Sequence, residues 1–274
     1  GGSVDILGSM TYATALLSIV MYLLLSAMNG WAYYAYLLII GMALLFAFVI
    51  VEGRVRSPML DLRLFTKNVS FMAGNVTALL NYISTYAVPF LLSLYLQAVL
   101  GYSPFIAGLL LVPQPIFMTA LSPVSGKLSD RYGSREIAAL GMGIIGLAFI
   151  MLLLLNTRNV INIAISLAIL GIGFGFFSAP NTNSVMSSVT PDKYGVASGI
   201  LGTMRFTGQL LSITIASTIL INYLGRVAAL YLFAGIILTN TIIYQSFVVG
   251  MKTMLIISAV LSFIGVYTSL LRSK

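Results

Sequence analysis

Long apolar runs separated by short polar turns dominate the chain. A helix that crosses about 30 Å of hydrocarbon needs about 20 mostly apolar residues. Eight runs approach or exceed that length, at residues 8–28, 31–51, 71–99, 104–124, 137–155, 161–179, 196–220 and 254–271. The pattern therefore predicts an all-α membrane protein, a polytopic helical bundle.

One further apolar stretch, residues 225–250, is broken by polar residues and a glycine, and is either a ninth span or a segment at the outer surface. Cytoplasmic loops carry an excess of Lys and Arg, so the basic residues choose between the two models. With the basic segment 52–68 in the cytoplasm, eight alternating spans leave few cations outside or at the outer boundary: Arg158, Arg226 and Lys252. A ninth span would move Arg272 and Lys274 outside. We expect eight spans in the cell membrane, both ends in the cytoplasm, and an external connection at 225–250.

Composition supports this class and narrows the chemistry. Hydrophobic residues make up 59% of the chain and charged residues 7%, whereas soluble domains carry about a quarter charged residues. The net charge of +8 sits in short loops, so we expect a lipid partner and no nucleic acid. Cysteine and histidine are absent, which removes thiolate nucleophiles, imidazole bases and most metal sites. We expect no cofactor and no enzymatic activity.

The most distinctive polar segment is GKLSDRYGSR, residues 126–135, between the fourth and fifth predicted spans. Glycines permit positive φ in a tight turn between helices. The aspartate can accept hydrogen bonds from a helix N-terminus or pair with an arginine. Its candidate functional residues are Gly126, Asp130, Arg131, Gly133 and Arg135. The alternative is a turn that only sets the orientation of the two spans.

This pattern, G-x-L-S-D-R-x-G-x-R, resembles the cytoplasmic loop motif of the major facilitator superfamily of transporters. Residues 94–104, LYLQAVLGYSP, resemble the first helix and external turn of the C-terminal half in that superfamily, and residues 197–208 resemble its fifth helix. The first two predicted spans and residues 58–65 resemble the fourteen-span drug:proton antiporter branch, in which two extra helices join the halves. Ser134 departs from the motif, which usually has a second basic residue there.

The resemblance implies three parts: a two-helix hairpin (1–52), a cytoplasmic amphipathic linker (53–68) and the six-helix C-terminal half of a transporter (69–274). It implies an alternating-access carrier that exports a small-molecule substrate in exchange for protons, with the 126–135 segment as a cytoplasmic gate. The chain begins Gly1-Gly2-Ser3 without methionine, so we expect a piece of a longer polypeptide. The alternative is a truncated or non-transporting helical membrane protein that serves as a remnant or scaffold.

Polar side chains inside predicted spans face other helices or a water-filled cavity. The cavity-lining candidates are Asn75, Asn81, Tyr82, Tyr86, Gln97, Gln114, Arg205 and Gln209. For each of them a contact between helices is the alternative role. Gln114 lies between two prolines that should interrupt the helix. Arg205 is expected to extend toward the cytoplasmic end, for example to Asp130, or to meet an anionic group in the cavity.

Acidic residues are confined to loops and helix ends: Asp5, Glu52, Asp61, Asp130, Glu136 and Asp192. A proton-coupled carrier generally needs a protonatable group within the membrane. The resemblance therefore implies that protons act through an N-terminal half absent from this chain.

Glycines at 141, 143 and 146 spell G-x-G-x-x-G, and three more lie at 171, 173 and 175. A dinucleotide site of this pattern needs a preceding strand, which the apolar pattern does not offer. We interpret both sets as small-residue faces for close packing of helices.

Overall fold

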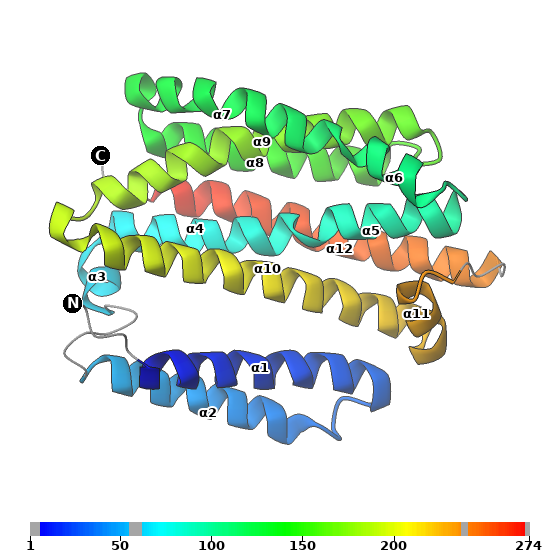
Figure 1. The fold of residues 1–274 in the computed structure, drawn as a ribbon, viewed down its shortest axis with the longest axis horizontal. Coiled ribbons are helices and arrows are strands. Elements are labelled where there is room, and N and C mark those ends of the chain that lie inside the picture. Colours follow the sequence, from blue (N-terminus) through cyan, green and yellow to red (C-terminus); the bar gives the residue numbers. More distant parts are fainter. Residues whose placement is uncertain (1–5, 55–61, 237–240, 272–274) are drawn as a thin grey trace.

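The computed structural model describes residues 6–54, 62–236 and 241–271, and these are almost entirely helical (Figure 1). The helices, with one π-helical turn (η1) and one 3₁₀ turn (η2), are α1 (Ile6–Asn29), α2 (Ala35–Glu52), α3 (Leu62–Lys67), α4 (Val69–Thr85), α5 (Ala87–Leu94), η1 (Tyr95–Val99), α6 (Pro104–Leu111), α7 (Pro113–Tyr132), α8 (Ser134–Leu154), α9 (Val160–Ser187), η2 (Pro191–Lys193), α10 (Tyr194–Leu224), α11 (Arg226–Phe233) and α12 (Thr241–Leu270).

Eight of these helical segments in the described residues are long and apolar enough to cross a membrane, which confirms the predicted number. The prediction for residues 225–250 was wrong in its second half, because the last span begins at Thr241 and not near residue 254. Phe247 explains the longer helix. It is 2% exposed and stacks on Tyr95, with ring centroids 6.5 Å apart. Burial of Phe247 on one face of α12 therefore stabilises the helix in this region, although polar residues occupy its other face.

The long helices lie side by side with their axes roughly aligned (Figure 1). The start of α1 and the end of α12 lie at the end that holds the turn between α7 and α8, which we call the Gly133 end. The turn between α8 and α9, the helix α11 and the start of α12 lie at the opposite end, which we call the Arg158 end. Of the linker predicted at 53–68, residues 55–61 lie outside the described residues, and Leu62–Lys67 form the short helix α3.

The α1–α2 hairpin makes polar contacts with α10 and with the start of α11. The hydroxyl oxygens of Tyr12 and Thr207 lie 2.5 Å apart. At the Arg158 end, Nη1 of Arg226 donates to Oδ1 of Asn29 over 3.2 Å. These contacts fix the hairpin against α10 and the first residue of α11.

Glycines bring α7, α8 and α9 into backbone contact, which confirms the predicted small-residue faces for Gly141, Gly171, Gly173 and Gly175 but not for Gly143, where a Cβ would meet only Val266 at 3.8 Å. A Cβ atom at Gly141 would lie 2.7 Å from the carbonyl oxygen of Gly173, and one at Gly173 would lie 2.9 Å from that of Gly141. On the other side of α9, a Cβ at Gly175 would lie 2.9 Å from the carbonyl oxygen of Met118, and one at Gly171 would overlap the backbone of Gln114. The helix α9 is thus held tightly on two sides.

The third predicted span, 71–99, was expected to be one helix, and it is instead divided at Tyr86 into α4 and α5 and ends in η1. Pro89 accounts for the division, since proline lacks the N–H that would bond to the carbonyl of Thr85 and clashes with it. The N–H of Ala87 is bonded to the hydroxyl of Ser212 on α10, 3.0 Å away. The fourth span is likewise divided, into α6 and α7, at Val112. This division was predicted from the prolines that flank Gln114.

Candidate functional site

The segment 126–135 contains a much shorter turn than predicted. The helix α7 continues to Tyr132, so Gly126 lies inside it and its expected role in the turn was wrong. The side chain of Ser125 explains the continuation, because it donates to the carbonyl oxygen of Gly175 on α9 over 2.7 Å and anchors this part of α7. Only Gly133 turns the chain, with a φ of 98° that favours glycine.

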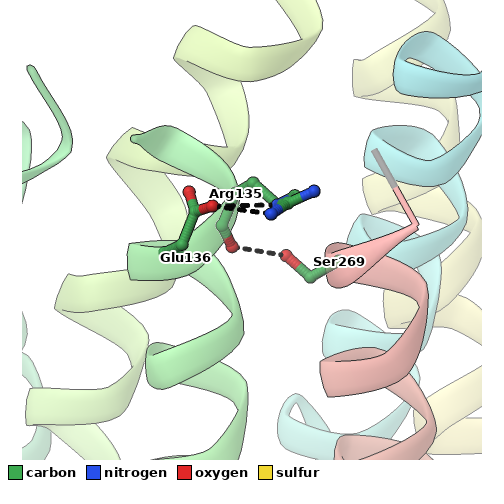
Figure 2. Close-up of polar contacts among 3 residues, drawn as sticks. All are labelled: Arg135, Glu136 and Ser269. Carbon is green, nitrogen blue, oxygen red and sulfur yellow. Dashed lines mark hydrogen bonds and ion pairs between the residues drawn. The ribbon is translucent and has the colours of Figure 1, made fainter. Parts of the chain in front are cut away.

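The arginine beside Gly133 pairs with Glu136 and not with Asp130, which was the predicted partner of an arginine (Figure 2). Arg135 pairs with its neighbour Glu136, with Nη2 to Oε1 at 2.8 Å. The hydroxyl of Ser269, in the last turn of α12, donates to the carbonyl oxygen of Arg135 over 3.2 Å. Arg131 lies over the ring of Tyr132, 5.3 Å from its centroid. Asp130 is exposed and has no hydrogen bond or ion pair with any residue that the structure describes.

A cavity of about 520 Å³ opens between the two divided spans and the helices α9 and α10. Its lining residues are Tyr82, Thr85, Tyr86, Pro89, Phe90, Gln114, Met118, Phe174, Gln209 and Ile213. Four of the predicted cavity residues lie together here: Tyr82, Tyr86, Gln114 and Gln209. This volume is within the range that small-molecule sites occupy in proteins.

The walls of the cavity are aromatic and its polar groups are neutral. The rings of Tyr82 and Phe174 meet edge to face, with centroids 5.6 Å apart. The amides of Gln114 and Gln209 offer donors and acceptors from facing helices. Such a site binds a ligand by stacking and hydrogen bonding.

Both divided spans are interrupted beside this cavity. Pro89 lines the cavity itself, and Gln114 stands in the first turn of α7, directly after the break at Val112. The backbone keeps helical dihedral angles at both points, with φ −68° and ψ −38° at Tyr86 and φ −59° and ψ −30° at Val112. Each division is therefore a local loss of helical hydrogen bonds beside the cavity, and neither span is unwound there. Prolines therefore stand at or beside the cavity in both spans.

Arg205 lies half-buried on α10, next to the cavity. The predicted contact with Asp130 is not formed. The Nη2 of Arg205 donates to the hydroxyl of Thr182 on α9 over 2.6 Å. A charge within a span needs a polar partner or water. Thr182 lies in the polar part of α9, between Asn181 and Asn183, and supplies this partner.

The other predicted cavity residues lie elsewhere. Asn75 and Asn81 are fully buried among helices. The Asn75 amide donates to the carbonyl of Phe71, and the Asn81 amide to the sulfur of Met142 on α8. Gln97 bonds to Ser93 and borders a separate cavity of about 290 Å³ at the Arg158 end.

Sequence reasoning missed the aromatic and apolar part of the cavity lining, which includes Phe90, Met118 and Phe174. Apolar residues in a lipid-facing span and in a cavity wall look alike in sequence. For Phe90 the adjacent Pro89 was an available signal.

Acidic groups of the described residues remain at helix ends, away from the cavity: Glu52, Asp130, Glu136 and Asp192. No three of them come together in a group that would hold a metal ion, within the part of the chain that the structure describes.

Apolar helices of spanning length around a cavity with neutral polar groups define a multi-pass membrane protein of the transporter class. Residues 6–213 match the Major Facilitator Superfamily, and the chain belongs to that superfamily.

Curated relatives are transporters and resistance proteins. The riboflavin transporter RibZ of Clostridioides difficile is 32% identical over 172 residues, which cover 61% of this chain and 38% of RibZ. The multidrug resistance protein Stp of Mycobacterium tuberculosis is 29% identical over 178 residues, 65% of this chain and 33% of Stp. The MFS-type transporter YvkA of Bacillus subtilis is 30% identical over 209 residues, 76% of this chain and 46% of YvkA. In each case the matched part spans less than half of the relative.

Proposed function

We propose that this chain is the C-terminal part of a fourteen-span drug:proton antiporter, which exports small amphipathic molecules by alternating access. The observation that carries the proposal is the cavity between two proline-divided spans, with aromatic walls and facing amides. The relationship to a multidrug resistance protein supports export as the direction of transport.

The proposed organisation has three parts. The α1–α2 hairpin, residues 1–52, joins the two halves of the transporter, and residues 53–68 form a linker on the cytoplasmic side. Residues 69–274 form the C-terminal six-helix half. Low burial of the α6–α7 span supports an unfilled face on this half. Only 6% of the apolar stretch of this span is buried, against 44–56% for the other spans between residues 69 and 270.

Substrate recognition in this half would rest on stacking and on hydrogen bonds to neutral groups. Tyr82, Tyr86 and Phe174 offer flat faces, and the amides of Gln114 and Gln209 fix the orientation of a planar ligand. Coupling to protons needs a titratable group in the membrane, and the described acidic residues all lie at helix ends. Protons would therefore be carried by a carboxylate of an N-terminal half.

The segment around Gly133 would act as the cytoplasmic gate. Asp130 is exposed in the last turn of α7 and has no partner in the described residues. It is therefore available to pair with a group on another half when the inner side of the cavity closes. Gly133, Arg131 and Arg135 would hold the turn in place.

The test is dye export from proteoliposomes that hold the complete polypeptide, with an imposed proton gradient. The Gln114→Leu variant should lower the export rate about tenfold, as expected when one substrate hydrogen bond is lost and its partner is left unpaired. The matched control is Phe117→Leu, on the same helix but outside the cavity lining. A protonophore should stop export by the wild type.

Equal rates of dye export by Gln114→Leu and Phe117→Leu would show that the cavity is not part of the transport route. Export that continues without a proton gradient would contradict the antiport mechanism. Absence of flux from the complete polypeptide would favour the alternative, a non-transporting helical scaffold.

A further inference from the structure

A second cavity, of about 690 Å³, opens at the Arg158 end and is separate from the one described above. It lies between η1, the turn between α8 and α9 and the start of α12. Its lining residues are Val99, Leu100, Arg158, Thr241, Tyr244, Gln245, Val248 and Val249. None of them lines the central cavity.

Polar and apolar lining residues follow one another along a single face of α12. Thr241, Tyr244 and Gln245 come first and Val248 and Val249 follow, at helical spacings of three, four, seven and eight residues from Thr241. Residues at these spacings share one face of a helix. The face therefore changes from polar to apolar over about 12 Å as the helix runs into the bundle.

The polar part of this cavity carries an uncompensated positive charge. The side chain of Arg158 is exposed and makes no hydrogen bond or ion pair with the residues that the structure describes. No Asp or Glu occurs in the sequence between Glu136 and Asp192 or after Asp192. The α8–α9 turn, α11 and α12 consequently hold cations without a carboxylate.

The frame around Arg158 is held by a buried tyrosine. The hydroxyl of Tyr95, in η1, lies 3.0 Å from that of Thr157 in the α8–α9 turn. The Tyr95 ring stacks on Phe247 of α12. This one side chain thus links the three elements that form the cavity.

Hydrogen bonds within the turn fix the backbone at Arg158. Oδ1 of Asn156 accepts from the N–H of Arg158 over 3.0 Å, and the backbone carbonyl of Asn156 accepts from the amide of Asn162 over 3.0 Å. The guanidinium is therefore presented from a fixed backbone, which lowers the entropy lost when it binds an anion.

We propose that this cavity binds one phospholipid with a net negative headgroup, from the leaflet at the Arg158 end. The lipid phosphate pairs with Arg158, and Tyr244 and Gln245 donate hydrogen bonds to the headgroup. An acyl chain lies along Val99, Leu100, Val248 and Val249. The planar guanidinium group of arginine forms paired hydrogen bonds with phosphate oxygens. The polar residues lie at the start of α12 and the apolar residues lie deeper in the bundle, which matches the order of headgroup and acyl chain in a lipid of that leaflet.

The experiment measures lipid retained by the purified full chain in native mass spectra, after washing with detergent that contains equal amounts of phosphatidylglycerol and phosphatidylcholine of the same chain length. The wild type should retain one phosphatidylglycerol in preference. Arg158→Gln should lower this retention about tenfold, the effect of losing one charge-assisted hydrogen bond. Lys252→Gln is the matched control, since it removes an exposed cation from α12 outside this cavity and should change nothing.

A second variant tests the acyl-chain part. Val249 is 48% exposed, so Val249→Trp fills the groove without strain in the core and should reduce phosphatidylglycerol retention as well. Thermal unfolding of each variant checks that the fold is kept. Equal retention by wild type and Arg158→Gln would overturn the proposal, and so would an equal loss in Lys252→Gln. Displacement of the lipid by free glycerol phosphate would also overturn it, because a soluble anion would then be the occupant.

Discussion

The hydroxyl of Ser212, on α10, accepts a hydrogen bond of 3.0 Å from the backbone N–H of Ala87, the first residue of α5. Both residues are fully buried. The bond satisfies a backbone donor at the point where Pro89 divides the third span. One hydroxyl from a distant helix therefore stabilises the interruption that borders the central cavity.

Substitution of Ser212 by alanine should lower the free energy of unfolding by about 1 kcal/mol, because the buried N–H of Ala87 loses its hydrogen-bond partner. Thermal unfolding in detergent measures the change. Thr14→Ala is the control, since Thr14 is exposed on α1 and bonds only to the carbonyl of Met10 in its own helix. An equal effect in both variants would show that the contact with α5 contributes nothing.

Substitution of Gly171 by alanine should destabilise the protein by about 1–3 kcal/mol, because the added methyl group overlaps the backbone of Gln114 and forces α7 away from α9. Gly143→Ala is the matched control. A Cβ there would meet only Val266, at an ordinary 3.8 Å, so the control should gain from the better helix propensity of alanine. The midpoint of thermal unfolding compares the two. A neutral Gly171→Ala would mean that the backbones are not in contact.

Substitution of Asp130 by asparagine should slow transport by the complete polypeptide about tenfold or more, while membrane insertion stays normal, if its carboxylate pairs with another half in the closed gate. Initial rates of dye export measure the effect, and the amount of protein in the membrane serves as a check. Asp192→Asn removes an exposed carboxylate from another turn of the same end and should leave the rate unchanged. Unchanged export by Asp130→Asn would show that residues 126–135 only set the orientation of the two spans and do not act as a gate.

Single cysteines can test the predicted orientation, because the chain contains none. Lys127→Cys, near the Gly133 end, should react with a membrane-impermeant maleimide only from the cytoplasmic side. Arg158→Cys should react only from outside. Both positions are exposed. Labelling from the same side would contradict the bundle topology, and reversed labelling would contradict the assignment of the cytoplasmic face.

Apolar run length was sufficient to predict the fold class and the number of spans, because the membrane sets a length that every span must reach. It did not place the start of the last span. There the stacking of Phe247 on Tyr95, a contact over some 150 positions of sequence, keeps residues 241–253 helical. The prolines beside Gln114 predicted one interruption, because the missing N–H is a local property.

The candidate site was predictable only for its polar members. Gln114, Gln209, Tyr82 and Tyr86 stood out as polar groups in apolar spans, and they lie around one cavity. Asn81 gave the same signal, yet it is buried between helices. Whether a polar side chain lines the cavity or lies between helices depends on which face of α4 packs against a neighbouring helix. The sequence of one span does not show which face that is. Gly126 was misplaced for a similar reason, since the bond from Ser125 to Gly175 joins residues 50 positions apart.

The glycine contacts have a mechanical consequence. Because α9 touches the backbones of α7 and α8, these three helices form one rigid plate. Gly208 brings α10 equally close to Leu79 and Tyr82, so α4 and α10 form a second plate. The central cavity lies in the joint between the plates, and the ring contact of Tyr82 with Phe174 and the bond from Arg205 to Thr182 bridge it. The helix α12 also joins the two plates, because Ser262 donates to Ser84 of α4 and Gly265 lies against Met142 of α8. A change in the width of the cavity therefore requires the contacts of α12 to shift as well.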